Sequence, residues 1–172
     1  VPCFNEEEAL TETNIRLIEI INNLIHLRKI SSNSKIYYVD DGSSDNTWKI
    51  IESLSIANSS QVSGIKLSRN FGHQNALKAG LDMCNADIII MMDCDLQHPP
   101  YLIIELLKNY ELGYEIVRTH RIDHISTGFL KAKTSNGKAE ILTGQASSML
   151  SAFADTNTFV FLGFHIFSLD RG

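Results

Sequence analysis

Two aspartates separated by one residue follow an apolar run in this 172-residue sequence. Asp93-Cys94-Asp95 comes directly after Ile88-Ile89-Ile90-Met91-Met92. Carboxylates this close repel each other and raise each other's pKa unless a cation lies between them or on their ligand. Carboxylate oxygens suit Mg²⁺ or Mn²⁺, which bind proteins through few carboxylates and add water and substrate phosphates. The pair therefore predicts a Mg²⁺ or Mn²⁺ site with Asp95 as the direct ligand and Asp93 beside it.

The same pattern also fits other roles. The two aspartates could cap the next helix and fill a polar turn, as Asp does in many proteins. A zinc site of Cys94, Asp95 and His98 is a further alternative, because cysteine and histidine are preferred zinc ligands, although no fourth ligand stands nearby in the sequence. An EF-hand loop is excluded, since its glycine and its terminal glutamate are missing. The other polar clusters of the sequence are therefore needed to choose among these roles.

Three other polar clusters also follow apolar runs, at residues 5–6, 40–43 and 68–70. Asp40 and Asp41 exceed what a helix cap needs and could accept hydrogen bonds from base or ribose groups, whereas capping explains Ser43 equally well. Arg69 could clamp phosphate or organise the acidic groups, although a solvated arginine is the ordinary explanation. His73 flanks the same turn. These clusters predict one shared polar site.

The runs between the clusters alternate between strand and helix patterns. Apolar spacing predicts helices around residues 10–25, 47–54, 76–81 and 101–107, and short apolar runs predict strands at 35–39, 64–68, 87–92 and 115–117. This order predicts an α/β fold with a mostly parallel sheet, helices on both faces, and 87–92 as a central strand buried on both faces. Ligands of such folds bind at the carboxyl ends of the strands, where the polar clusters stand.

Composition limits the possible functions. The length suits one domain, and 44% hydrophobic with 20% charged residues is typical of globular proteins. A net charge of -5 argues against a general nucleic-acid-binding surface. Three cysteines at unrelated spacings predict neither a disulfide framework nor a four-cysteine zinc site, which favours a reducing compartment. No signal peptide and no apolar run of roughly 20 residues stands out. Val1-Pro2 resembles the end of a strand, so we expect a fragment.

Four segments, at residues 1–7, 39–47, 67–72 and 92–100, together resemble the family 2 glycosyltransferases. These are inverting enzymes of the Rossmann-like GT-A fold that use nucleotide-diphosphate sugars. The fourth segment is similar to the metal-binding motif of the subgroup with polyprenyl-phosphate acceptors, such as dolichyl-phosphate mannosyl and undecaprenyl-phosphate glucosyl transferases. The resemblance covers about residues 1–123. It implies a nucleotide-sugar-binding core at 1–119 and an acceptor-side segment at 120–172.

The resemblance also implies roles for individual residues. Asp95 would hold Mg²⁺ or Mn²⁺ on the diphosphate, Asp93 would face ribose or uracil, and Arg121 stands in the place of a family arginine that we expect to be catalytic together with Asp95. We add two residues of the polar clusters to the nucleotide-sugar contacts, which then comprise Pro2, Asn5, Glu6, Asp41, Ser43, Arg69, Asp93 and Asp95. The later acceptor-side motif is not recognisable, and no catalytic base is assigned.

We therefore expect transfer of a sugar from a UDP- or GDP-sugar to a polyprenyl phosphate, with inversion, at the cytoplasmic face of the membrane in cell-envelope glycan synthesis. The main alternative is a catalytically silent nucleotide-sugar-binding module. A nucleotidyltransferase is disfavoured, because residues 2–7 hold neither glycine nor lysine. A dinucleotide-dependent oxidoreductase lacks its Gly-x-Gly-x-x-Gly pattern. The sequence predicts neither the sugar nor the oligomeric state.

Overall fold

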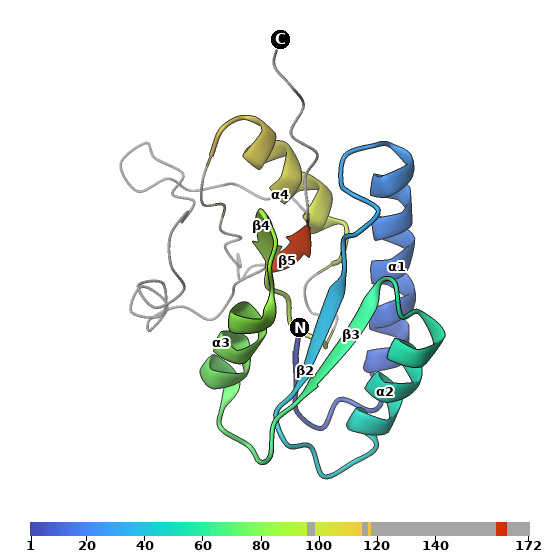
Figure 1. The fold of residues 1–172 in the computed structure, drawn as a ribbon, viewed down its shortest axis with the longest axis vertical. Coiled ribbons are helices and arrows are strands. Elements are labelled where there is room, and N and C mark those ends of the chain that lie inside the picture. Colours follow the sequence, from blue (N-terminus) through green and yellow to red (C-terminus); the bar gives the residue numbers. More distant parts are fainter. Residues whose placement is uncertain (96–98, 115–116, 118–160, 165–172) are drawn as a thin grey trace, which may run out of the picture. The chain divides into compact units, whose positions relative to one another are not determined.

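The computed structural model describes residues 1–95, 99–114, 117 and 161–164. The chain divides into two compact units, one formed by residues 1–100 with 161–172 and the other by residues 101–160. The polar clusters at residues 5–6, 40–43, 68–70 and 93–95 all belong to the first unit. Figure 1 traces the helices and strands of the chain.

A three-stranded parallel sheet organises the first unit, in the order β1 (Pro2–Cys3), β2 (Ile36–Asp40) and β3 (Val62–Lys66). Cys3 pairs with Asp40, and Asp40 pairs with Lys66. The β-branched and aromatic residues of β2 favour an extended chain, and most of them are buried. Because the three strands run in the same direction, their carboxyl ends lie at one edge of the sheet.

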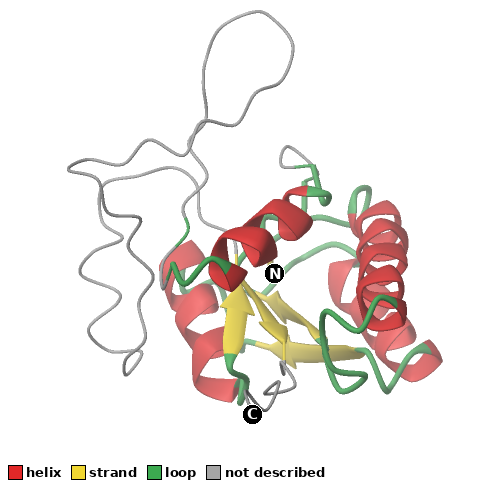
Figure 2. Cartoon of the chain, turned by 90° about the horizontal axis from the view of Figure 1, so that it is seen from above, coloured by secondary structure: helices red, strands yellow, loops and turns green. Residues whose placement is uncertain are grey.

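Helices cover both faces of this sheet (Figure 2). They are α1 (Leu10–His26), α2 (Thr47–Ala57) and α3 (His73–Met83). Successive residues of a strand point to opposite faces of the sheet, so two neighbouring residues of β2 show which helix packs on each face. The Tyr38 hydroxyl donates to Asn14 Oδ1 of α1 at 3.3 Å, whereas Val39 packs against Gly80 of α3. The predicted α/β class, with a parallel sheet and helices on both faces, is confirmed.

Two strands differ from the sequence prediction. β3 begins and ends two residues earlier than residues 64–68, because its register with β2 starts at Ile36 opposite Val62. β4 spans only Ile88–Ile90 and pairs antiparallel with β5 (Phe161–Phe164), so the prediction of a central parallel strand buried on both faces is wrong. Ile88 and Ile89 are only half-buried. An apolar run does not specify its pairing partner, which here comes from far along the chain.

The second unit contains α4 (Leu102–Glu111). Its buried residues are the predicted stripe, Leu102, Ile103, Leu106 and Leu107. In the predicted strand at 115–117, residues 115 and 116 lie outside the described residues. None of the helices in the described part of the chain is both long enough and apolar enough to span a membrane.

Gly64 of β3 lies against α2 without room for a methyl group. A Cβ atom there would lie 2.6 Å from Ile51 Cγ2 and 3.3 Å from the Trp48 ring. We expect Gly64→Ala to lower the free energy of unfolding by about 1–3 kcal/mol, the usual cost of overpacking. Urea denaturation measures it, with Ser63→Ala as the neighbouring control. A Gly64→Ala chain as stable as the control would contradict this close packing.

Candidate functional site

The segments that follow β1, β2, β3 and β4 meet around one pocket of about 290 Å³. The polar clusters are therefore brought together, as the sequence predicts, and Glu6, Asp41, Asp93 and Asp95 all contribute carboxylates to the wall. The full lining is Pro2, Cys3, Phe4, Glu6, Asp41, Asn70, Gly72, His73, Ala76, Asp93, Cys94 and Asp95. The pocket lies entirely within the first unit.

Negative charge is crowded in this pocket. Desolvation raises the pKa of Glu6, and the charges of Asp95 and Asp93, and then of Asp45, raise it further. His73 Nε2 lies 3.9 Å from Asp93 Oδ1, too far for a hydrogen bond but close enough for attraction when the imidazole is protonated. Glu6 and the Asp-Cys-Asp turn, residues 93–95, thus lie within electrostatic reach of one another.

This donor set fits a hard divalent cation. Asp93 and Asp95 supply oxygen ligands, and a cation between them would relieve the repulsion that acts on Glu6. In the part of the chain that the structure describes, no three His, Cys, Asp or Glu side chains are arranged to hold a metal. A cation here would therefore depend on these two carboxylates and on ligands from water or substrate. The zinc alternative involved His98, which lies outside the described residues.

The Asp-Cys-Asp turn is anchored through its middle residue. Thr13 Oγ1 of α1 donates a buried hydrogen bond of 2.6 Å to the Cys94 carbonyl. The Cys94 thiol contacts the Cys3 thiol, and this contact, together with burial, raises the pKa of Cys3 well above its ordinary value. Thr13 was not predicted as a site residue, although a polar residue at helical spacing between Leu10 and Leu17 stands out on an apolar helix face.

The loop after β1 is bonded to the turn after β2. The Asn5 amide donates to Ser43 Oγ at 2.9 Å, and Asn5 Oδ1 accepts from the Ser44 amide at 2.9 Å. The Glu6 amide donates to Thr47 Oγ1 at 2.8 Å. Asn5 and Ser43 do not line the pocket. They hold the two loops together, and their contacts with the nucleotide stay a prediction.

Glu7 and Asp45 extend this link. Glu7 Oε2 accepts from both the backbone and side-chain nitrogens of Asn46, each at 2.9 Å. Asp45 accepts from the amides of Thr47, at 2.9 Å, and Glu7, at 3.2 Å. Desolvation opposes ionisation of Asp45, but the hydrogen bonds from Thr47 and Glu7 outweigh it and lower the pKa. Asp45 therefore has a structural role, in which it stabilises the turn before α2 and links it to the loop after β1.

Asp41 ties the turn after β2 to the loop after β3. Its Oδ1 accepts from the Phe71 amide at 2.8 Å, and its Oδ2 accepts from the Gly72 amide at 2.9 Å. Gly42 has a φ of 71°, and a Cβ atom there would lie 2.3 Å from the Arg69 carbonyl carbon. This turn needs glycine, because the two loops touch at backbone level.

Arg69, like Asn5 and Ser43, is a predicted site residue that does not line the pocket. The Arg69 guanidinium lies over the Phe71 ring, 4.2 Å from its centre, and Nη1 donates to the Asn70 carbonyl at 3.2 Å. Arg121 lies outside the described residues. The predicted roles of both arginines therefore stay predictions.

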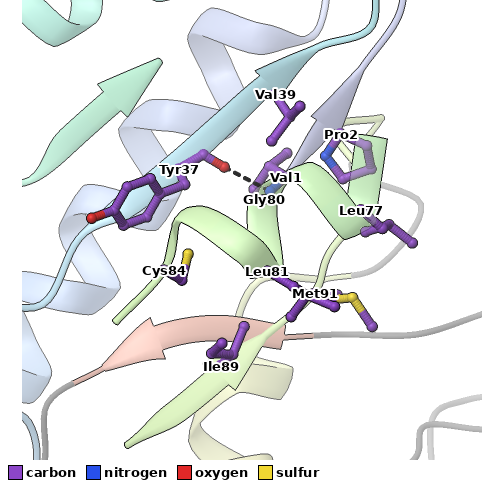
Figure 3. Close-up of a pocket in the computed structure, with 10 residues that line it drawn as sticks. All are labelled: Val1, Pro2, Tyr37, Val39, Leu77, Gly80, Leu81, Cys84, Ile89 and Met91. Atoms are coloured by element: carbon purple, nitrogen blue, oxygen red, sulfur yellow. Dashed lines mark hydrogen bonds between the residues drawn. The ribbon is translucent and has the colours of Figure 1, made fainter. Parts of the chain in front are cut away.

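A second cavity, of about 30 Å³, lies beside β1, β2, α3 and β4 (Figure 3). Its wall is mainly apolar, including Val39, Leu81 and Met91. At its edge the Val1 nitrogen donates to the Tyr37 carbonyl at 2.7 Å. The cavity is small and offers few polar groups for orienting a ligand, so the acidic pocket is the candidate site.

Comparison with known proteins adds the relationship. A family model described as "Glycosyl transferase family 2" matches residues 1–169. The chain is 40% identical over 157 residues to "Uncharacterized glycosyltransferase YkoT" of Bacillus subtilis, covering 90% of this chain and 46% of that protein. It is 33% identical over 149 residues to "Undecaprenyl-phosphate 4-deoxy-4-formamido-L-arabinose transferase" of Proteus mirabilis, covering 87% and 44%. The chain spans about half the length of these relatives.

Among solved structures, the crystal structure of Staphylococcus aureus TarS residues 1–349 superposes with a TM-score of 0.49 and 18% identity. The match covers 74% of this chain and 36% of that one.

Asp41→Asn tests the bond between the two loops. The asparagine side chain has one acceptor oxygen, so its NH₂ group would face a backbone N–H group that now donates to Asp41. We expect the free energy of unfolding to fall by about 1–3 kcal/mol, the cost of an unsatisfied buried donor. Urea denaturation measures it, with Asp82→Asn, on the exposed side of α3, as the control. Equal stability of the two variants would refute the role of Asp41.

Asp95→Asn tests the crowding of charge. Removing the Asp95 charge should bring the pKa of Glu6 down toward its ordinary value, because Asp95 is the largest of the charges that raise it. The ¹³C titration of the Glu6 carboxyl group measures the change in the metal-free chain. Asp82→Asn is again the control. An unchanged Glu6 titration in Asp95→Asn would show that the two carboxylates do not interact.

Proposed function

Because the chain belongs to glycosyl transferase family 2, we propose that it is the donor-binding part of an enzyme that transfers a sugar from a nucleotide diphosphate, with inversion at the anomeric carbon. The observation that carries this proposal is the acidic pocket, where Asp93 and Asp95 meet Glu6 and Asp41 beyond the ends of the strands. Folds with parallel strands and covering helices bind ligands at this edge.

The donor is a UDP- or GDP-sugar. Pro2, Glu6, Asp41 and Asp93 line the pocket and contact the nucleotide in this proposal. The Asp41 oxygens each accept one backbone hydrogen bond and have a second lone pair available for a base or ribose group. Asn5 and Ser43 support the donor from the two bonded loops, and Arg69 reaches it from the rim.

Asp95, with Asp93 beside it, holds Mg²⁺ or Mn²⁺. When bound, the cation supplies Lewis-acid stabilisation of the departing nucleotide diphosphate. The residues of the chain contribute by attracting and orienting it: the pocket collects several negative charges in a partly desolvated place, which raises its affinity for a divalent ion. A bound cation would thus make the proximity of these carboxylates favourable, although they repel one another in its absence.

The acceptor is a polyprenyl phosphate. The Proteus mirabilis relative is named as an undecaprenyl-phosphate transferase, which supports this class of acceptor. A phosphate oxygen is already anionic, so it attacks the anomeric carbon without a general base. The bond from this carbon to the acceptor oxygen forms as the bond to the donor diphosphate oxygen breaks. Arg121 assists catalysis, and the reaction takes place at the cytoplasmic face of the membrane in envelope glycan synthesis.

Asp95→Ala is expected to abolish Mn²⁺-dependent binding of the nucleotide sugar. The remaining carboxylate, Asp93, is a single ligand, and losing one of two carboxylates removes most of the protein's share of the coordination. Isothermal titration calorimetry with UDP-glucose and GDP-mannose, each with and without Mn²⁺, measures the effect. Asp82→Ala, which removes an exposed carboxylate of α3, is the matched control and should bind like the wild type.

Unchanged affinity of Asp95→Ala in the presence of Mn²⁺ would overturn the cation site. The transfer step needs a separate test on the wild-type full-length protein, with undecaprenyl phosphate as acceptor. If the donor binds but neither donor hydrolysis nor transfer is detected, the silent binding module replaces the enzyme.

A further inference from the structure

Thr13 is a polar residue on the buried face of α1. It is completely buried, at helical spacing from the buried residues Leu10 and Leu17. Its hydroxyl donates to the Cys94 carbonyl at 2.6 Å, across 81 positions of sequence. Burying a hydroxyl group in a protein core costs free energy unless the group forms a hydrogen bond. The partner here lies between the two aspartates of the candidate cation site.

We propose that Thr13 is a positioning residue that holds the Cys94 carbonyl so that the Asp93 and Asp95 carboxylates face the pocket. The inference rests on the proposed function, since it assigns to α1 a task in the same cation and donor site. Thr13 itself does not line the pocket, so it acts through the turn and not on the ligand.

The geometry of a peptide chain explains why one bond can orient both carboxylates. The Cys94 carbonyl belongs to the planar peptide group that joins Cys94 to Asp95, so fixing this oxygen fixes the plane from which Asp95 starts. The Cys94 side chain is only 2% exposed and contacts the Cys3 thiol, which fixes the residue from its other side. The turn is thus held at its centre.

The acidic groups repel one another, and the turn must be held against this repulsion. Repulsion between Glu6, Asp93 and Asp95 tends to spread the pocket before a cation enters. The hydrogen bond from Thr13 opposes this spreading, because α1 is packed on the sheet and cannot follow the turn. A site held in its binding geometry loses less conformational entropy when the ligand arrives.

A matched hydrogen bond on the next residue separates positioning from general stability. Asn14 Oδ1 accepts from the Tyr38 hydroxyl at 3.3 Å, also buried and also between α1 and a distant segment. This bond reaches β2 and not the Asp-Cys-Asp turn. Tyr38→Phe therefore removes a neighbouring buried hydrogen bond of α1 while leaving the turn in place.

The first measurement is Mn²⁺ affinity by electron paramagnetic resonance, with UDP and GDP each as the added nucleotide. Thr13→Val keeps the shape without the hydroxyl and should weaken Mn²⁺ binding by about 10–100-fold, the usual effect of removing a group that orients a metal ligand. Thr13→Ser keeps the hydroxyl and should restore most of the affinity. Tyr38→Phe should bind Mn²⁺ like the wild type. Thr13→Ala replaces Thr13→Val if valine prevents folding.

The second measurement needs no metal. Alkylation of Cys94 by iodoacetamide, followed by peptide mass spectrometry, should be slow in the wild type, in Thr13→Ser and in Tyr38→Phe, and faster in Thr13→Val, because the released turn exposes the thiol. Faster alkylation together with weaker Mn²⁺ binding is the expected result.

The other outcomes contradict either the positioning role of Thr13 or the cation site itself. If Thr13→Val alkylates slowly, or alkylates faster but binds Mn²⁺ like the wild type, Thr13 does not position the carboxylates and the inference fails while the cation site stands. If the wild type itself binds no Mn²⁺, the cation site fails, and with it the positioning role. The wild type and the variant thus separate the two failures.

Discussion

Repulsion between carboxylates is the constraint on which the structure of this site depends. Glu6, Asp93 and Asp95 come from two loops and lie close enough to raise the pKa of Glu6. A parallel sheet brings such loops together because its strands end at one edge, but it does not hold them against like charge. The loops must therefore be fixed by contacts outside the pocket, and each of them has such contacts.

The polar residues consequently divide into two groups with different work. Asn5, Ser43 and Asp45 bond the loop after β1 to the turn after β2, and Asp41 bonds that turn to the loop after β3. Asp93 and Asp95 extend from a turn whose centre is anchored in the core. Substitutions in the first group should alter stability first, and substitutions in the second group should alter cation binding first. Asp41 belongs to both, since it also lines the pocket.

Sequence patterns predicted the parts of this arrangement that are local. Apolar spacing placed the helices, and polar residues after apolar runs identified the segments that line the pocket. The pairing of β4 was not predictable, because its partner, Phe161–Phe164, lies some seventy residues on and an apolar run does not encode its neighbour. The bond between Asn5 and Ser43 was missed for the same reason, since each residue has a plausible local role by itself. Arg121 lies outside the described residues, as do residues 120–160 and 165–172 of the predicted acceptor-side segment.

The contrast between Asp45 and Glu6 bears on whether the acidic pocket is only a polar turn. Asp45 is an acidic group in a structural role: it accepts hydrogen bonds from the Thr47 and Glu7 amides, and its pKa is lowered. Glu6 shows the opposite shift, because desolvation and the two aspartates act against its charge. A capping role needs one ionised carboxylate near backbone N–H groups and gains nothing from a third carboxylate beside it. A divalent cation reverses the sign of that interaction, so the crowding that is unfavourable in an ordinary turn becomes favourable in a cation site.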